Sequence, residues 1–153
     1  MKRLKILSIL FMAMALTNCG DQELICGESR YKGIIVQDAG LHGWCINDLR
    51  DQSLIINSQA ELDSLYAARD CEEETDTGID FSQYTLLGVF VAGGGCDATF
   101  IREVKEDPEK GKYTYSVKMR ECGLCEMYIY SMNWVLVPKL PEGWYVEFIT
   151  SHV

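Results

Sequence analysis

The sequence has little histidine and little proline. Its 153 residues include two histidines, His42 and His152, and three prolines. A histidine must lie beside its partner in a Ser–His or Cys–His catalytic pair, and beside the ion in a histidine-based metal site. With two histidines, the sequence offers few candidates for either kind of site. The G-x-S-x-G motif of α/β-hydrolases is absent as well. We therefore expect no catalytic residue, no metal and no cofactor, and favour a non-enzymatic protein.

Long apolar runs are also scarce, and only Ile6–Leu16 is almost wholly apolar. It is shorter than the roughly 20 residues needed to cross a bilayer core about 30 Å thick. Lys2, Arg3 and Lys5 precede the run, and Leu16-Thr17-Asn18-Cys19 closes it. Positive charge, a short apolar run and a small or polar pair are together typical of a secretory signal.

The segment Leu16-Thr17-Asn18-Cys19 resembles the lipobox of bacterial lipoproteins. This resemblance implies cleavage before Cys19, a thioether bond from its sulfur to diacylglycerol, and acylation of its amino group by a fatty acid such as palmitate. The membrane would then be a partner through this anchor, at the periplasmic or surface face of the outer membrane. An ordinary signal peptide with a coincidental cysteine is the alternative.

The rest of the chain is acidic and long enough for one domain. Loss of the three cations of the signal takes the formal charge from -9 to about -12. Such a chain repels phosphates, so we expect no nucleic-acid partner. The expected organisation is a signal peptide at 1–18, a lipidated tether at 19–30 and a single β-rich domain at 31–153.

Six cysteines remain after Cys19, and an even number in an exported domain predicts disulfide bonds. Two of them form a C-x-x-C motif at Cys122 and Cys125, which in thioredoxin-like enzymes lies at a helix N-terminus. Here strand-like runs flank it, so structural bridges are favoured, and a thiol–disulfide oxidoreductase is the alternative. A second closely spaced pair, as in a zinc ribbon, is missing. The six cysteines are Cys26, Cys45, Cys71, Cys96, Cys122 and Cys125.

An expected hairpin offers a partial argument for their pairing. If its turn, Asp107–Gly111, is centred on the middle residue, Cys96 lies opposite Cys122. Matching Phe100 with Val117 instead needs a shift of one residue, which would reverse the face of every side chain. We take the first register as the leading one. The predicted bridges are Cys96–Cys122 and, by elimination, Cys71–Cys125 and Cys26–Cys45.

Apolar periodicity predicts one helix and several strands. Ser58 and Glu61 have the spacing of a capping box, and Leu62, Leu65 and Tyr66 fall on one face of a helix over 59–68. The fold class expected is α+β, a strand-rich, mostly antiparallel sheet with one amphipathic helix, disulfide-braced. The expected strands are Lys32–Gln37, Leu54–Ile56, Tyr84–Ala92, Ala98–Lys105, Lys112–Arg120, Glu126–Val137 and Trp144–Thr150.

Two further patterns have an ordinary and a functional interpretation. The acidic run Asp70–Asp76 and Asp80 could supply oxygen ligands for calcium, but the EF-hand order is missing, so a solvated loop is favoured. Tyr128, Tyr130 and Trp134 alternate along one expected strand. Such aromatics could line a sugar-binding face, which makes a carbohydrate-binding module another alternative, although they are more often core.

The order of segments in the domain resembles a known family. Ile55–Leu62, Ile79–Gly88, the hairpin and Trp134–Lys139 are similar to the PrcB-like domain of protease-complex accessory lipoproteins, and to small Gram-negative surface lipoproteins. The resemblance covers about residues 54–149 and implies no catalytic residue. It implies an exported binding or accessory module that stabilises or regulates another envelope protein.

We expect Cys19→Ser to abolish membrane anchoring, because the substitution removes the sulfur that would carry the diacylglycerol. The variant should move from the detergent phase to the aqueous phase in a partitioning experiment, and its precursor should no longer respond to globomycin. Unchanged partitioning of the variant, together with globomycin-insensitive processing of the wild-type precursor, would contradict lipidation.

Overall fold

A computed structural model describes residues 25–39, 41, 46, 48–71 and 77–153. Within these residues no helix is long and apolar enough to cross a membrane. The elements in chain order are β1 (Arg30–Gly33), β2 (Gln37–Asp38), β3 (Ser53–Ile56), α2 (Gln59–Ala68), β4 (Tyr84–Gly94), β5 (Asp97–Asp107), β6 (Lys112–Cys122), β7 (Tyr128–Pro138) and β8 (Tyr145–His152).

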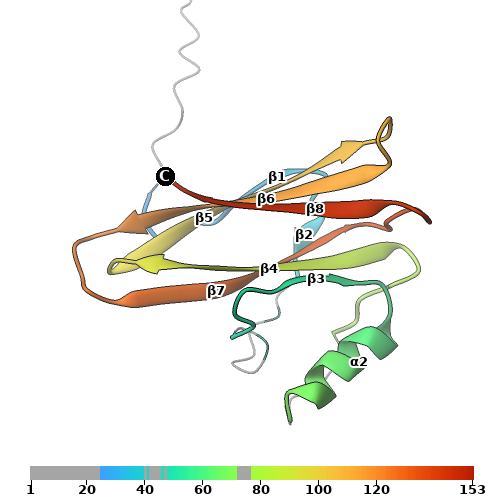
Figure 1. Cartoon of the computed structure of the whole chain (residues 1–153), viewed down its shortest axis with the longest axis horizontal. Coiled ribbons are helices and arrows are strands. Elements are labelled where there is room, and N and C mark those ends of the chain that lie inside the picture. The colour runs from blue at the N-terminus through green and yellow to red at the C-terminus, as the bar shows by residue number, and fades with distance from the viewer. Residues whose placement is uncertain (1–24, 40, 42–45, 47, 72–76) are drawn as a thin grey trace, which may run out of the picture.

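The strands form two sheets rather than one. Sheet I has the order β1-β5-β6-β8 and sheet II the order β2-β7-β4-β3. Figure 1 shows the two sheets packed face to face, with α2 on the far side of sheet II. The predicted strand-rich domain with a short helix is confirmed. The single, mostly antiparallel sheet is corrected: there are two sheets, and sheet I contains two parallel pairs, β1 with β5 and β6 with β8.

The main core lies between the two sheets. On β6, Tyr113, Tyr115, Val117 and Met119 are buried and alternate with more exposed polar residues, as the sequence predicts. They meet the inward-facing side chains of β4, which include Leu87. The full set of buried residues in this cluster is Leu87, Val89, Val91, Ala98, Phe100, Val104, Tyr113, Tyr115, Val117, Met119, Val135 and Val137.

A second core covers the outer face of sheet II. Leu62 and Tyr66 of α2 pack there against Leu86, Trp134 and other buried side chains. The helix spans the predicted residues, and its capping box forms. The Glu61 N–H donates to Ser58 Oγ at 3.2 Å, and the Glu61 carboxylate accepts from the Asn57 N–H at 2.6 Å. β4 is therefore apolar on both faces because it is a central strand with a core on each side.

A buried polar network sets where α2 begins relative to sheet II. The Thr85 hydroxyl donates to Asn57 Oδ1 at 2.7 Å and accepts from the Leu140 N–H at 2.9 Å. Lys139 Nζ donates to the carbonyls of Asn57 and Phe81 at 2.7 and 2.9 Å. These bonds join the residue before the helix cap to the ends of β4 and β7.

The predicted strand over Lys32–Gln37 is divided between the two sheets. β1 ends at Gly33, and the chain then crosses to pair with β7, the Val36 N–H donating to the Leu136 carbonyl at 2.8 Å. Gly33 has φ 75°, and a Cβ there would collide with the carbonyl of Val104. Only glycine meets both conditions without strain.

We expect Gly33→Ala to lower the free energy of unfolding by about 2–4 kcal/mol, since it combines a positive φ with a backbone collision. Gly78→Ala is the matched control: Gly78 has φ 65° but nothing within 4 Å of a Cβ. It should cost only the conformational part, about 1–2 kcal/mol. Urea unfolding measures the free energy of unfolding of both variants. Equal decreases would show that the close approach of Gly33 to the Val104 carbonyl does not add to the cost of the substitution.

Candidate functional site

Two disulfide bonds join loops at one end of the sandwich. Cys26 is bonded to Cys122, with 5.9 Å between the Cα atoms, and Cys96 to Cys125, with 4.7 Å. Cys71 is disulfide-bonded as well, whereas Cys45 and the proposed lipidation site Cys19 lie outside the described residues. The expectation of a disulfide-braced domain is therefore confirmed for the described cysteines.

The predicted pairing is wrong, and the register of the β5–β6 hairpin is the reason. Asp97, not Cys96, lies opposite Cys122, and Phe100 lies opposite Met119 rather than Val117. This register differs from both that the sequence suggested. Cys96 then packs over Gly123, where any Cβ would strike its sulfur. Bridges Cys96–Cys122, Cys71–Cys125 and Cys26–Cys45 are accordingly all replaced.

The C-x-x-C cysteines belong to two different bridges. Cys122 is the last residue of β6, and Cys125 lies in the connection to β7. An oxidoreductase of this type cycles a bond between the two cysteines of the motif, with the attacking thiol at a helix N-terminus. In this chain each cysteine is bonded outside the motif, so the arrangement favours a structural role.

The bridges hold together three segments that are distant in sequence. Cys26 brings the segment before β1 to the end of β6, and the Thr99 hydroxyl donates to the Ile25 carbonyl at 2.9 Å. The Gly95 N–H donates to the Met127 carbonyl at 3.2 Å, which joins the β4–β5 and β6–β7 connections. Both connections lie at the same end of the sandwich (Figure 1). Part of the expected tether is thus attached to this end.

Exposed apolar and aromatic side chains gather at this end, and we call them the aromatic patch. Leu124 is fully exposed, and Tyr128 and Tyr130 are 61% and 37% exposed. The rings of Tyr128 and Tyr130 are 5.7 Å apart, and that of Phe90 is 6.0 Å from Tyr130. The patch consists of Phe90, Leu124, Met127, Tyr128 and Tyr130.

The two exposed tyrosines of the patch lie on the outer face of sheet II, beyond the part that the second core covers. Along β7, Tyr128 and Tyr130 alternate onto the same face as Met132 and Trp134. The last two are buried in the second core, while the two tyrosines are not. The aromatic alternation seen in the sequence is therefore divided: Trp134 belongs to the core, whereas Tyr128 and Tyr130 are exposed.

A buried arginine is the feature that the sequence analysis missed. Arg102 on β5 is 7% exposed and points inward like Phe100 and Val104. Its Nε donates to Asn133 Oδ1 at 2.9 Å, and its Nη1 donates to the Tyr31 hydroxyl at 3.0 Å. The signal was available, because Arg102 occupies an inward position of a half-buried strand.

Tyr31 links this arginine to the surface. Its hydroxyl donates to the carboxylate of Asp38, and its ring lies 5.2 Å from the guanidinium carbon. Burial, followed by the hydrogen bond to Asp38, raises the pKa of Tyr31 above its ordinary value. The phenol therefore stays neutral while it joins a cation to an anion.

A polar cavity of about 180 Å³ lies beside Arg102. β2 pairs with β7 only at Val135 and Leu136, so the edge of β7 before Val135 has no strand partner among the described elements. Trp134 also lines the cavity, and its buried indole N–H has no hydrogen-bond partner among the residues that the structure describes. The described lining residues are Ser29, Asp38, Leu41, Arg102, Ser131, Met132 and Trp134.

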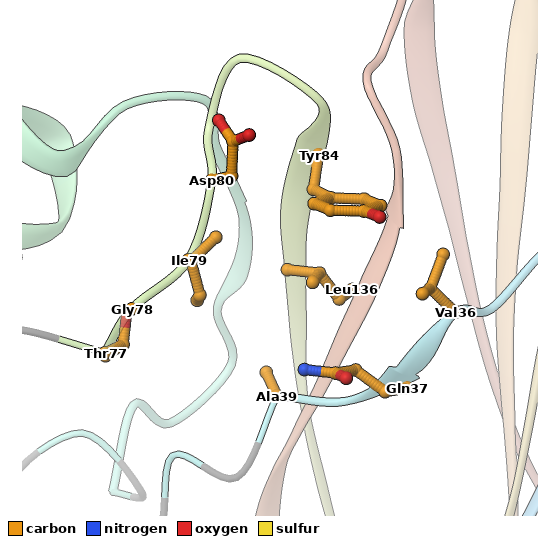
Figure 2. Close-up of a pocket in the computed structure, with 9 residues that line it drawn as sticks. All are labelled: Val36, Gln37, Ala39, Thr77, Gly78, Ile79, Asp80, Tyr84 and Leu136. Atoms are coloured by element: carbon orange, nitrogen blue, oxygen red, sulfur yellow. The ribbon is translucent and has the colours of Figure 1, made fainter.

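A second cavity, of about 170 Å³, lies between the β2 segment and the irregular segment 77–80 that precedes β4 (Figure 2). In Figure 2 Tyr84 and Leu136 form one wall, and Asp80 stands at its upper edge. Asp80 accepts from the N–H and hydroxyl of Ser82 at 3.0 and 2.6 Å, and these bonds hold the pKa of Asp80 below its usual value. This carboxylate is thus engaged in its own turn.

Metal binding finds no support among the residues described. They contain no group of three or more His, Cys, Asp or Glu side chains placed to hold a metal ion. Of the acidic residues considered as calcium ligands, Glu72, Glu74 and Asp76 lie outside the described residues.

We expect the two bridges to contribute unequally to stability. Replacing both cysteines of a bridge by serine should cost about 2–4 kcal/mol, and Cys26–Cys122 should cost about 1 kcal/mol more than Cys96–Cys125 because it closes a longer loop. The sequence separations are 96 and 29. Urea unfolding of the two double variants tests this, and peptide mapping without reduction should recover both pairs.

The wild-type protein should resist thiol labelling after denaturation without reduction, and it should not reduce insulin above background. Turnover that disappears in Cys122→Ser while stability is preserved would instead indicate an oxidoreductase.

Comparison with known proteins finds no family model, no curated protein and no solved structure that matches this chain.

Proposed function

We propose that this protein is an exported, non-enzymatic binding module, anchored to the outer membrane through Cys19, that stabilises or regulates another envelope protein. The observation that carries the proposal is the aromatic patch. Apart from Phe90, which is partly buried against the second core, it consists of side chains that the fold leaves exposed although the domain has two cores available. Exposed apolar clusters of this kind mark interaction sites.

The position of the patch relative to the expected anchor supports a partner at the membrane. Cys26 is seven positions after Cys19 in the chain, a reach of at most about 25 Å. Cys26 is bonded to Cys122, two residues before Leu124 of the patch. A lipid at Cys19 would therefore hold the patch end of the sandwich near the bilayer, where an envelope protein is within reach.

The chemistry of the patch favours a protein over the lipid surface itself. Tyrosines and methionine are enriched in the centres of protein interfaces, and a rigid backbone lowers the entropy cost of binding. Two hydrogen-bonded and disulfide-bonded connections provide that rigidity here. The acidic chain is repelled by an anionic membrane surface, so apolar contact with a protein is the better match.

A carbohydrate ligand is the second candidate, and the exposed rings of Tyr128 and Tyr130 favour it. A sugar site also needs polar groups beside the aromatic platform to bind hydroxyls. Leu124 and Met127, both exposed, are near these tyrosines in the chain. Arg50, paired with Asp48, interacts electrostatically with both tyrosines, so charged groups are present beside the rings as well. A protein partner is preferred because it would cover the exposed apolar side chains, which a sugar would leave in water.

Site-specific photo-crosslinking in native envelopes tests the proposal. A photoreactive residue at Leu124 should give a discrete protein adduct, whereas one at Lys118, exposed on the outer face of sheet I, should not. Tyr128→Ser should reduce the Leu124 adduct at least fivefold. Its melting temperature should be unchanged, because the side chain is largely exposed.

The other outcomes separate the alternatives. Adducts with lipid alone would replace the protein partner by the bilayer, and competition by soluble glycans would favour the carbohydrate-binding module. Equal adducts from both faces, or none from either, would contradict a role for the patch.

A further inference from the structure

We propose that the polar cavity beside Arg102 is a binding site for a carboxylate group. The inference does not depend on the aromatic patch or on lipid anchoring. It depends on the cavity containing a buried cation and unused hydrogen-bond donors.

Within the part of the chain that the structure describes, no carboxylate pairs directly with the buried guanidinium of Arg102, and Asp38 reaches it only through the Tyr31 hydroxyl. Among the described residues its hydrogen bonds go to two neutral groups, the Asn133 amide oxygen and the Tyr31 hydroxyl. These use the Nε and Nη1 donors and leave other N–H groups of the guanidinium for a ligand. A buried charge that has no directly paired counter-charge is costly, and an anion in contact with the guanidinium would reduce that cost.

Trp134, on a different strand, belongs to the same lining and provides a reporter for the cavity. It is 3% exposed, and within the described part of the chain its indole N–H has no hydrogen-bond partner. The nitrogen itself is covered, so its signal reports on the cavity wall, and the guanidinium of Arg102 is the group that would contact the ligand. The Ser131 hydroxyl already donates to the Met132 carbonyl at 3.2 Å, which leaves Arg102 as the donor on which the proposal depends.

The size and charge of the cavity favour one carboxylate over a phosphate. About 180 Å³ holds several waters at roughly 30 Å³ each, or a small organic acid. A planar guanidinium matches a carboxylate in shape. Asp38 also lines the cavity, and its negative charge would oppose a doubly charged phosphate more than a singly charged carboxylate.

The experiment is a titration of the full-length protein with sodium acetate, in which acetate replaces chloride at constant ionic strength. The probe is the indole N–H signal of Trp134 in an NMR spectrum, assigned from its loss in Trp134→Phe. This signal should shift along a saturable curve, while that of Trp144, packed against Tyr113 elsewhere, should not.

Two variants test the proposal by the direction in which each changes the affinity for acetate. Asp38→Asn keeps an acceptor for the Tyr31 hydroxyl and removes the competing charge, so acetate should bind about threefold to tenfold more tightly. Arg102→Gln should abolish saturation. If that variant fails to fold, the direction of the Asp38→Asn effect decides. A linear shift in the wild type, or unchanged affinity in Asp38→Asn, would overturn the proposal.

The source of the carboxylate is settled by a second ligand. N-acetylglutamate amide presents the same group on a peptide-like stem. Binding at least tenfold tighter than acetate would identify an acidic side chain of a protein, and equal or weaker binding would identify a free small acid. Inorganic phosphate serves as the chemical control and should compete less well than acetate.

Discussion

The burial of both faces of sheet II is the constraint on which the rest of this structure depends. β4 and β7 send alternate side chains into the core against sheet I and into the core beneath α2. Their eleven-residue pairing makes them the longest ladder of that sheet. Gly88 lies opposite Trp134 on β7, and any Cβ there would strike the indole ring. Close packing of this kind leaves the two strands no freedom to slide.

The two ends of the β4–β7 ladder differ in how far the outer face of sheet II is covered, and the less covered end carries the tyrosines of the aromatic patch. α2 covers the part of the outer face around Leu86 and Trp134. Nothing described covers Tyr128 and Tyr130, which stack with each other and with Phe90. Disulfide bonds and the Gly95–Met127 hydrogen bond hold the adjoining connections in place. The chain thus stabilises an end at which it exposes a cluster of apolar side chains, which is the arrangement that a binding surface requires.

Arg102 is a charged side chain at a buried, inward-facing position of β5 where the strand pattern would place an apolar residue. A charge on the inward face of β5 costs stability unless hydrogen bonds and an opposite charge compensate it. The chain supplies the hydrogen bonds through Asn133 and Tyr31 and places Asp38 one hydroxyl away. Asn133 is itself held by the carbonyls of Ser131 and Val89. Departures of this kind from a purely apolar core are typical of functional sites.

The sequence by itself determined the local elements. Ser58 and Glu61 are close in the chain, and their capping box placed α2 correctly; the alternation from Tyr113 to Met119 identified the buried face of β6. Short-range patterns succeed because neighbouring residues alone satisfy them. Tyr128 and Tyr130 were recognised as candidates, but their exposure depended on how far α2 extends over the sheet.

Tertiary structure decided everything that joins distant residues. The segment 32–37 is divided between two sheets at Gly33, where the backbone approaches β5 so closely that a side chain would not fit. No local sequence pattern contains this contact. The cysteine pairing depended on the hairpin register, and a difference of one residue in register changes which side chains meet. The burial of Arg102 and its hydrogen bonds could be recognised only from the tertiary structure, because its partners Tyr31 and Asn133 lie on other strands, β1 and β7.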